Sequence, residues 1–269
     1  MADFCVLPFE HPTTVALVDD DTHYLQQFPL SLSTLGTVQT YDAPLAAVKA
    51  IRARMEQCGN QRGPRHCLSM VGGSERFDTL SVIVSDFEMG AMNGIELCAE
   101  FRDTPMGRII LTGKLDERHA ISAFNDKIID RYVRKDDPAQ LDLVRQFIVE
   151  LKREYFLRLA DELDRKPLLL DHDYLFDPEF VTFFQQVRES NDVVEYYLDT
   201  DLPGFIMLDP EGEVLACKVI TEKQLAEQVE QAEVHKAPAE LLELLRKGQV
   251  VPVFPTRDGF YQSNCAGNW

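Results

Sequence analysis

The 269-residue chain has no excess of positive charge: 27 basic residues stand against 45 acidic ones, a formal net charge of −18. Residues 139–269 hold 13 basic and 25 acidic residues, a net charge of −12, which leaves −6 for residues 1–138. Nucleic-acid binding depends on a basic surface facing the phosphate backbone. The composition therefore argues against a nucleic-acid partner. The basic residues Lys152, Arg153 and Arg158 are interpreted as the solvated face of a helix.

Long apolar runs and paired cysteines are also missing. No run approaches the roughly 18 apolar residues of a membrane span, and Met1 to Pro8 lacks the length and basic start of a signal peptide. Without a CxxC pair, reduced thiols are expected rather than a disulfide framework or a zinc site. These absences predict a cytoplasmic protein with no membrane partner. The cysteines are Cys5, Cys58, Cys67, Cys98, Cys217 and Cys265.

Short apolar runs and helical patterns alternate over the first half of the chain. Such alternation predicts an α/β fold, a doubly wound five-stranded parallel sheet of the flavodoxin-like kind. The predicted strands are Val15–Val18, Thr37–Tyr41, Ser81–Ser85, Ile109–Thr112 and Arg131–Arg134, and the predicted helices are Asp21–Ser33, Leu45–Gln57, Gly94–Arg102, Asp116–Phe124 and one from Pro138 onward.

The stretch Cys58–Phe77 interrupts this alternation. It is rich in Gly, Arg and Ser, and a loop of roughly twenty residues is unusual inside a compact domain. We interpret it as an insertion before the third strand, with a binding loop as the alternative.

Carboxylates follow two of the predicted strands. Asp19 and Asp20 come directly after Val15–Val18, and Asp86 ends the apolar run that starts at Ser81. The carboxyl ends of parallel strands meet at one edge of the sheet, where open α/β sheets bind ligands. Mg²⁺ prefers one or two carboxylates together with waters and a phosphate. We expect Asp20, Asp86 and the main-chain carbonyl of Glu88 to bind Mg²⁺, and Asp19 to hold a coordinated water.

Two further strand ends supply groups for phosphate oxygens. Thr112 ends the fourth predicted strand and offers a hydroxyl, and Lys135 follows the fifth and offers an ammonium group. Phosphoryl transfer to a carboxylate needs a nucleophile, a divalent cation and groups that stabilise the remaining oxygens. This set therefore predicts an aspartate that accepts a phosphoryl group.

The order of these residues resembles the receiver domain of bacterial two-component response regulators, over roughly the first half of the chain. The resemblance implies phosphorylation of Asp86, a metal site at Asp19, Asp20, Asp86 and Glu88, and switch residues Thr112, Lys135 and Tyr132. Two positions depart from the family pattern. Gly90 stands where proline is usual, and Asp136 stands where proline normally follows the switch lysine, placing a negative charge beside Lys135.

The resemblance implies a phosphoprotein of a two-component system or phosphorelay, which is not an enzyme beyond assisting its own phosphoryl transfer and hydrolysis. The implied partners are a sensor histidine kinase or phosphotransfer protein and a downstream protein. A homodimer through the switch face is implied as well, although no residue indicates one. Phosphorylation is expected to pull Thr112 inward, with Tyr132 following, which changes the face formed by Ile109–Thr112, Asp116–Phe124 and Arg131–Arg134. A degenerate receiver, folded but never phosphorylated, is the alternative.

The second half predicts a smaller α+β domain. Ala139–Lys166 has a helical pattern that Pro167 ends, and Asp209–Gly212 is a hairpin signal. The expected division is a receiver at 1–138, a connecting helix at 139–166 and an output or interaction domain at 167–269. The other predicted elements are helices Pro178–Glu189, Glu222–Glu233 and Pro238–Lys247 and strands Val193–Leu198, Phe205–Leu208, Val214–Val219 and Val250–Phe254.

No motif after residue 150 points to catalysis. The triplet around His172 is interpreted as an acidic surface loop rather than a metal site, and Phe180, Phe183, Phe184 and Val187 as core rather than a ligand pocket. The second domain is therefore predicted to be a protein-interaction module. A DNA-binding output is the main alternative, and Glu222–Glu233, with one Lys and four Glu, argues against it. An enzymatic output of unrecognised type is a third alternative.

Overall fold

The computed structural model describes residues 5–58, 79–113, 117–162, 172–199 and 204–250. The chain divides into two compact units, Met1–Glu195 and Tyr196–Trp269. The predicted insertion at Cys58–Phe77 and the predicted strand at Val250–Phe254 lie almost entirely outside the described residues. Among the described residues, no helix combines the length and the apolar character needed to cross a membrane.

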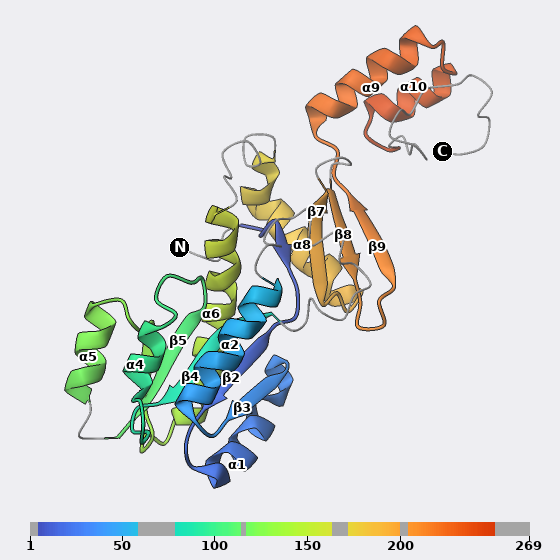
Figure 1. Cartoon of the computed structure of the whole chain (residues 1–269). Helices are drawn as coiled ribbons and strands as arrows, with labels where there is room; N and C mark the ends of the chain where they lie inside the picture. The colour runs from blue at the N-terminus through green and yellow to red at the C-terminus, as the bar shows by residue number, and fades with distance from the viewer. Residues whose placement is uncertain (1–4, 59–78, 114–116, 163–171, 200–203, 251–269) are drawn as a thin grey trace. The chain divides into compact units, whose positions relative to one another are not determined.

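The first unit is built on a five-stranded parallel sheet in the order β3-β2-β4-β5-β6 (Figure 1). This confirms the flavodoxin-like, doubly wound fold expected from the alternating pattern. The strands are β2 (Thr14–Val18), β3 (Val38–Tyr41), β4 (Leu80–Asp86), β5 (Gly107–Thr112) and β6 (Arg131–Arg134), and a two-residue strand, β1 (Phe9–Glu10), precedes them.

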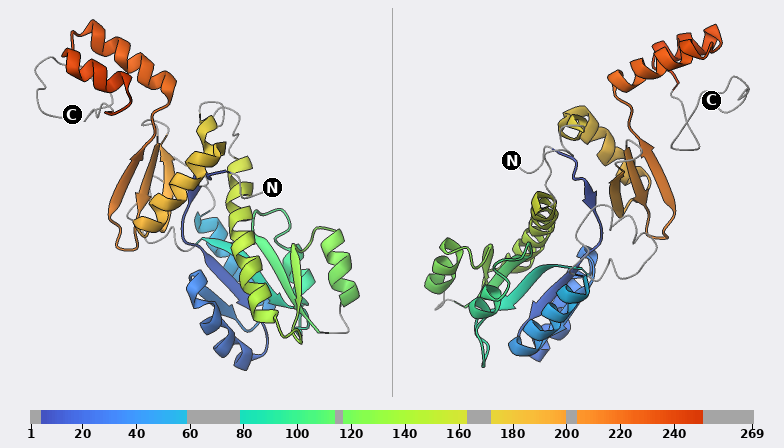
Figure 2. Two further views of the ribbon diagram at one scale, coloured as in Figure 1. Left: turned by 180° about the vertical axis from the view of Figure 1, so that it is seen from behind. Right: turned by 45° about the horizontal axis from the view of Figure 1, so that its top comes forward.

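Helices cover both faces of this sheet, because β2, β4 and β5 are apolar on both sides and fully buried. One core joins these strands to α1 and α6, and α6 crosses the near face in the left view of Figure 2. A second core joins Ile110 to α4 and α5 on the other face. The helices are α1 (Thr22–Leu32), α2 (Pro44–Cys58), α4 (Gly94–Ala99), α5 (Glu117–Asn125) and α6 (Gln140–Glu162), with a short 3-10 turn, η1 (Ser33–Leu35), after α1.

The basic residues of α6 are not on a solvated face, so that prediction was wrong. Arg158 donates to Asp130 at 2.8 Å, and Asp130 also accepts from the Arg108 side chain at 3.2 Å. Arg153 donates to the Cys5 carbonyl at 3.0 Å, and Lys152 donates to the Leu35 carbonyl. A charge pattern along a helix could not reveal these contacts, because the acceptors come from segments distant in sequence.

The first unit ends with η3 (Asp173–Phe176) and α8 (Pro178–Ser190). Asp177 caps α8 by accepting from the backbone N–H groups of Glu179 and Phe180. Of the aromatic residues predicted to form a core stripe, Phe184 is buried, but Phe183 is half-exposed. The stripe is therefore only partly core. The ring of His172 packs edge-to-face on Tyr174, with centroids 5.6 Å apart.

The second unit contains most of β7 (Glu195–Asp199), then β8 (Gly204–Leu208) and β9 (Val214–Lys218), consecutive strands of a second sheet. β8 and β9 pair antiparallel across the predicted hairpin turn, where Gly212 adopts φ +86° and donates to the Asp209 carbonyl at 3.1 Å. Helices α9 (Glu222–Val234) and α10 (Ala239–Arg246) follow and share a small core around Leu241 and Leu245. An additional α+β region with an antiparallel sheet thus follows the parallel sheet, as expected.

Candidate phosphoryl-acceptor site

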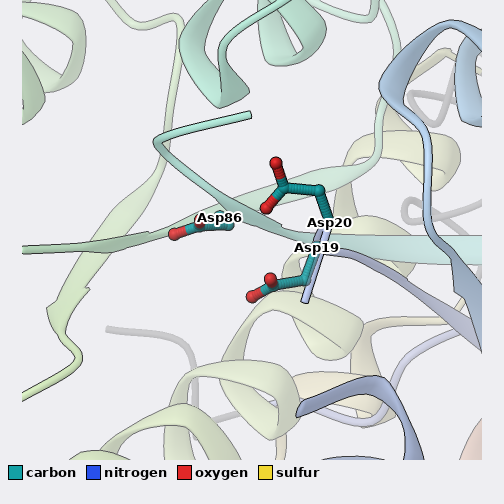
Figure 3. A group of neighbouring side chains, drawn as sticks. All are labelled: Asp19, Asp20 and Asp86. Carbon is teal, nitrogen blue, oxygen red and sulfur yellow. The ribbon is translucent and has the colours of Figure 1, made fainter. Parts of the chain in front are cut away.

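Asp19, Asp20 and Asp86 form one cluster at the carboxyl edge of the parallel sheet (Figure 3). A ligand oxygen of each lies within 4.8 Å of the others. Asp19 and Asp86 are buried, whereas Asp20 is exposed. The pairing of β2 with β4 creates the cluster, because Val18 lies beside Ser85 and each strand then continues into its aspartate.

Lys135 enters this cluster from the end of β6. Its ammonium lies 2.9 Å from Asp19 Oδ2 and 2.9 Å from Asp86 Oδ1. Burial alone would lower its pKa, but the hydrogen bonds to these two carboxylates raise the pKa of Lys135 above its ordinary value. The lysine is therefore held in its charged form as the counterion of two aspartates.

The surroundings of Asp86 disfavour its charged form. Burial raises the pKa of Asp86, and the nearby Asp19 carboxylate raises it further, whereas Lys135 and the Phe87 N–H group oppose the shift. A buried carboxylate whose negative charge is only partly balanced is destabilised, and a bound divalent cation or a bond to an electrophile would reduce that destabilisation. Such carboxylates are common at functional sites. Asp86, at the end of β4, is thus a candidate reactive carboxylate.

Backbone hydrogen bonds hold the predicted strand ends side by side. Phe87 N–H donates to the Leu111 carbonyl at 2.9 Å, and Lys135 N–H donates to the Thr112 carbonyl at 2.9 Å. Thr112 is fully buried, and its hydroxyl donates to the Gly113 carbonyl at 3.0 Å rather than into the carboxylate cluster. Tyr132 packs half-buried against the core that contains Ile110. To donate to a phosphoryl oxygen, the Thr112 hydroxyl would have to release the Gly113 carbonyl.

The loop after Asp86 is shaped by a glycine and a helix cap. A Cβ on Gly94 would lie 2.0 Å from the Asp86 carbonyl, so this close approach requires glycine. Asn93 caps α4 in a reciprocal pair with Glu96. Glu88 lies in this loop with its side chain exposed. Gly90 is exposed, and a Cβ there would meet nothing within 4 Å, so space does not explain the glycine at this position.

Two residues that the sequence did not single out complete the surroundings of Lys135. The ammonium lies 5.0 Å from the centre of the Tyr24 ring, and Gln140 donates to the Tyr24 hydroxyl at 3.1 Å. Burial and the Asp19 charge both raise the pKa of Tyr24. Tyr24 lies in the first turn of α1, directly after the Asp21 cap. The closeness of Tyr24 to Asp19 and Asp20 in the sequence was the signal that could have identified it.

Asp136 does not neutralise the lysine beside it. Its carboxylate accepts two hydrogen bonds of 3.0 Å from Arg134. The charge of Asp136, which departs from the family pattern, therefore pairs with Arg134. Lys135 pairs instead with Asp19 and Asp86.

The donor set suits a hard cation. Three carboxylates within 4.8 Å offer oxygen ligands alone, which Mg²⁺ prefers. Among the described residues, these three form the one such group of acidic, histidine or cysteine side chains. The exposed Asp20 gives the cluster an open side, which a metal needs if it is to keep waters and bind a phosphate as well.

No family model and no curated protein matches the sequence. Among solved structures, the response regulator LqsR of Legionella pneumophila matches with a TM-score of 0.78 and 29% identity, covering 94% of this chain and 80% of LqsR. An adenylate cyclase from Rhodopirellula baltica has a TM-score of 0.41 and 24% identity, covering 56% of this chain and 95% of its own. A response regulator receiver domain protein from Clostridium thermocellum has a TM-score of 0.40 and 19% identity, covering 54% and 98%.

The match to LqsR includes both the parallel sheet and part of the second half, since it covers 94% of the chain. The five-stranded parallel sheet has the doubly wound fold that the alternating pattern predicted, and the chain is similar to a response regulator over most of its length.

Proposed function

We propose that the protein is a two-component response regulator that is phosphorylated on Asp86 in the presence of Mg²⁺. The observation that supports this most strongly is the position of Lys135, 2.9 Å from both Asp19 and Asp86 in a cluster of three carboxylates. The likeness to LqsR over nearly the whole chain supports the regulator role. We also propose that the chain consists of a receiver domain at 1–138, a connecting helix at 139–166 and an output domain at 167–269.

In the proposed reaction, a carboxylate oxygen of Asp86 attacks the phosphorus of the donor. The new P–O bond forms as the bond to the leaving group breaks, and the leaving group departs with the electron pair. Lys135, already beside Asp86, stabilises one phosphoryl oxygen, and Thr112 donates to another after releasing the Gly113 carbonyl. Asp20, Asp86 and the Glu88 carbonyl would hold Mg²⁺, with Asp19 on a coordinated water; the ion supplies charge neutralisation for the transferred group.

The phosphoryl group would then bias a two-state equilibrium. Movement of Thr112 toward it leaves space beside β5, into which Tyr132 follows from its half-buried position. The face formed by β5, α5 and β6 would present different contacts to a partner. The partners we propose are a sensor histidine kinase or phosphotransfer protein upstream and another protein downstream.

We propose an interaction role for the second domain rather than DNA binding. Its helix α9 carries four Glu and one Lys, and α10 carries two Glu and one Arg. A recognition helix needs a basic surface. A mobility-shift assay tests this part: salt-sensitive retention of DNA by the full chain would contradict it. A cytoplasmic location belongs to the same proposal, in keeping with the reduced cysteines expected from the sequence.

The phosphorylation site is tested with a small phosphodonor such as acetyl phosphate, with and without Mg²⁺, by intact-protein mass spectrometry. The wild type should gain one phosphoryl group only with Mg²⁺, and Asp86→Asn should gain none. Asp126→Asn, which removes an exposed carboxylate at the end of α5, is the matched control and should label as the wild type does. Equal labelling of Asp86→Asn would refute the assignment to Asp86, and a wild type that gains no phosphoryl group would favour a degenerate receiver.

A further inference from the structure

Three groups surround the ammonium of Lys135. It lies 2.9 Å from Asp19 Oδ2, 2.9 Å from Asp86 Oδ1 and 5.0 Å from the centre of the Tyr24 ring. The face of an aromatic ring attracts a cation that lies within about 6 Å of its centre. The two carboxylates attract the ammonium through their charge, whereas the ring attracts it without carrying one. Tyr24 is therefore an uncharged partner of Lys135 beside the proposed phosphorylation site.

The Tyr24 ring is fixed in place by contacts to two helices. It stacks on Phe28, one turn further along α1, with centroids 4.6 Å apart and an angle of 20° between the planes. Gln140, the first residue of α6, donates to the Tyr24 hydroxyl at 3.1 Å. Burial and the Asp19 charge raise the pKa of Tyr24, so the ring stays neutral at physiological pH. A neutral ring that is held on two sides can restrain the ammonium that lies over it.

The Lys135 side chain needs such a restraint during phosphoryl transfer. A lysine has a flexible stem and loses rotamer freedom when its ammonium is held in one place. The side chain of Lys135 is 32% exposed, so water competes for the ammonium. As the proposed P–O bond forms, the Asp86 carboxylate loses its negative charge, and its attraction for the ammonium weakens. The contact with Tyr24 does not depend on that charge and remains.

We infer, on the basis of the proposed phosphorylation of Asp86, that Tyr24 is a positioning residue for phosphoryl transfer. Its ring keeps the Lys135 ammonium beside Asp86 while the lysine exchanges a carboxylate oxygen for a phosphoryl oxygen. A cation that is already in place when charge develops in the transition state lowers the barrier, because little reorganisation is needed. Tyr24 acts through Lys135 and is assigned no bond to the phosphoryl group. Its task differs from that of Tyr132, which packs against the core around Ile110.

The first test is the initial rate at which the full-length protein gains a phosphoryl group from acetyl phosphate with Mg²⁺, followed by intact-protein mass spectrometry. Tyr24→Leu removes the ring and should label about fivefold more slowly than the wild type. Tyr24→Phe keeps the ring and should label within about twofold of the wild-type rate. If Tyr24→Leu labels as fast as Tyr24→Phe, the ring does not position the lysine.

Phe147→Leu is the matched control. The Phe147 ring in α6 lies 5.5 Å from the guanidinium carbon of Arg131, so this variant removes a ring from beside a different cation of the same unit. It should label at the wild-type rate. An equal slowing by Phe147→Leu would show that the loss of any such ring contact slows labelling, which would contradict a specific role for Tyr24.

Fluorinated phenylalanines in place of Tyr24 keep the test decisive if Tyr24→Leu fails to fold. Added fluorine withdraws electron density from the face of the ring and weakens its attraction for a cation, while the ring keeps nearly the same size. The labelling rate should therefore fall step by step from phenylalanine to its mono-, di- and trifluorinated forms. Equal rates across this series would overturn the role of the ring.

The side-chain NMR signals of Lys135 give a second readout, which does not depend on labelling. The Tyr24 ring current should shift the protons next to the ammonium upfield in the wild type and in Tyr24→Phe without Mg²⁺, but not in Tyr24→Leu. The shift should persist in the wild type when Mg²⁺ and beryllium fluoride, a mimic of the phosphoryl group, are added. Its loss would show that the lysine leaves the ring and would refute the positioning role.

The outcomes separate the role of Tyr24 from the proposed function. A wild type that gains no phosphoryl group would overturn both the phosphorylation of Asp86 and the role of Tyr24. If the wild type labels, Asp86→Asn does not, and Tyr24→Leu is as fast as Tyr24→Phe, only the role of Tyr24 is overturned.

Discussion

Two half-buried lysines lie at opposite ends of the same sheet, and their surroundings shift their pKa values in opposite directions. Lys135 lies between Asp19 and Asp86, whose hydrogen bonds raise its pKa. Lys152 donates to two backbone carbonyls, and burial lowers its pKa to about 8. Burial disfavours both charges, so the presence of carboxylates decides the outcome. At one end a lysine lies between two carboxylates, and at the other Lys152 donates to two uncharged carbonyl groups.

Removing the ammonium from the carboxylate cluster should have the largest effect. Lys135→Met leaves Asp19 and Asp86 buried beside each other without their counterion. Because the lysine is partly exposed, we expect a loss of about 2–3 kcal/mol in the free energy of unfolding without Mg²⁺, at the lower end of losses for broken buried pairs. Urea unfolding measures it. Mg²⁺ should recover part of the loss, and an unchanged midpoint would contradict the counterion role.

The second lysine, Lys152, should make the free energy of unfolding increase with pH. Folding lowers the pKa of Lys152 from 10.5 to about 8, so the cost of burying its charge is present below pH 8 and disappears as the pH rises toward 10.5. The wild type should therefore gain stability relative to Lys152→Met over this interval. One pKa unit corresponds to about 1.4 kcal/mol, and with partial exposure we expect a gain of about 2 kcal/mol.

Lys135 should not show this increase with pH. Folding raises the pKa of Lys135, so its stabilising contribution is fully present below pH 10.5 and is lost as the pH rises through the folded-state value. The stability difference between the wild type and Lys135→Met should stay constant from pH 8 to 10, whereas that for Lys152→Met increases. Parallel curves for the two variants would show that the two environments do not differ as described.

A smaller effect is expected at the proposed phosphorylation site. Asp86→Asn removes a carboxylate whose pKa is raised by burial and by Asp19, and keeps a group of similar shape. Above the raised pKa, the buried charge destabilises the folded protein, so the variant should be more stable by about 1 kcal/mol at neutral pH. Guanidinium unfolding in the absence of Mg²⁺ measures the difference. It should vanish in acid, where Asp86 is protonated, and a gain that persists there would have another cause.

The smallest effect concerns the aromatic neighbour of Lys135. Tyr24→Phe keeps the ring over the ammonium but loses the hydrogen bond from Gln140, whereas Tyr24→Leu loses both. We expect a loss of about 0.5–1 kcal/mol for each interaction, measured by thermal unfolding. Gln140→Ala should reproduce the effect of Tyr24→Phe. A Tyr24→Leu variant no less stable than Tyr24→Phe would exclude a contribution from the ring.

Much of the parallel sheet could be predicted because its signals are local. The apolar runs at Val15–Val18 and Ser81–Ser85 have the length and branching of buried strands, and each is extended by only one or two residues in the structure. The hairpin turn at Asp209–Gly212 was likewise recognisable from adjacent residues. The two-residue strand β1 and the turns η1 and η3 are too short to produce a periodic pattern, and they were missed.

The basic residues of α6 show where prediction failed. A helical pattern indicates which positions lie on a polar face, but not what lies opposite that face. Arg158 donates a hydrogen bond to Asp130, 28 residues away, and Lys152 donates to the carbonyl of Leu35, 117 residues away. A solvated face and a buried network of hydrogen bonds have the same sequence pattern.

The sequence by itself determined that Asp19, Asp20, Asp86, Thr112 and Lys135 would meet at one edge of the sheet. That follows because parallel strands place their carboxyl ends together whatever the intervening helices contain. Only the tertiary structure decided the electrostatics at each end. Lys135 meets Asp19 from 116 residues away, whereas the hydrogen-bond partners of Lys152 among the described residues are carbonyl groups. The physical reason is that a lysine's charge state depends on burial and on the charges within a few ångströms, and long-range contacts set both.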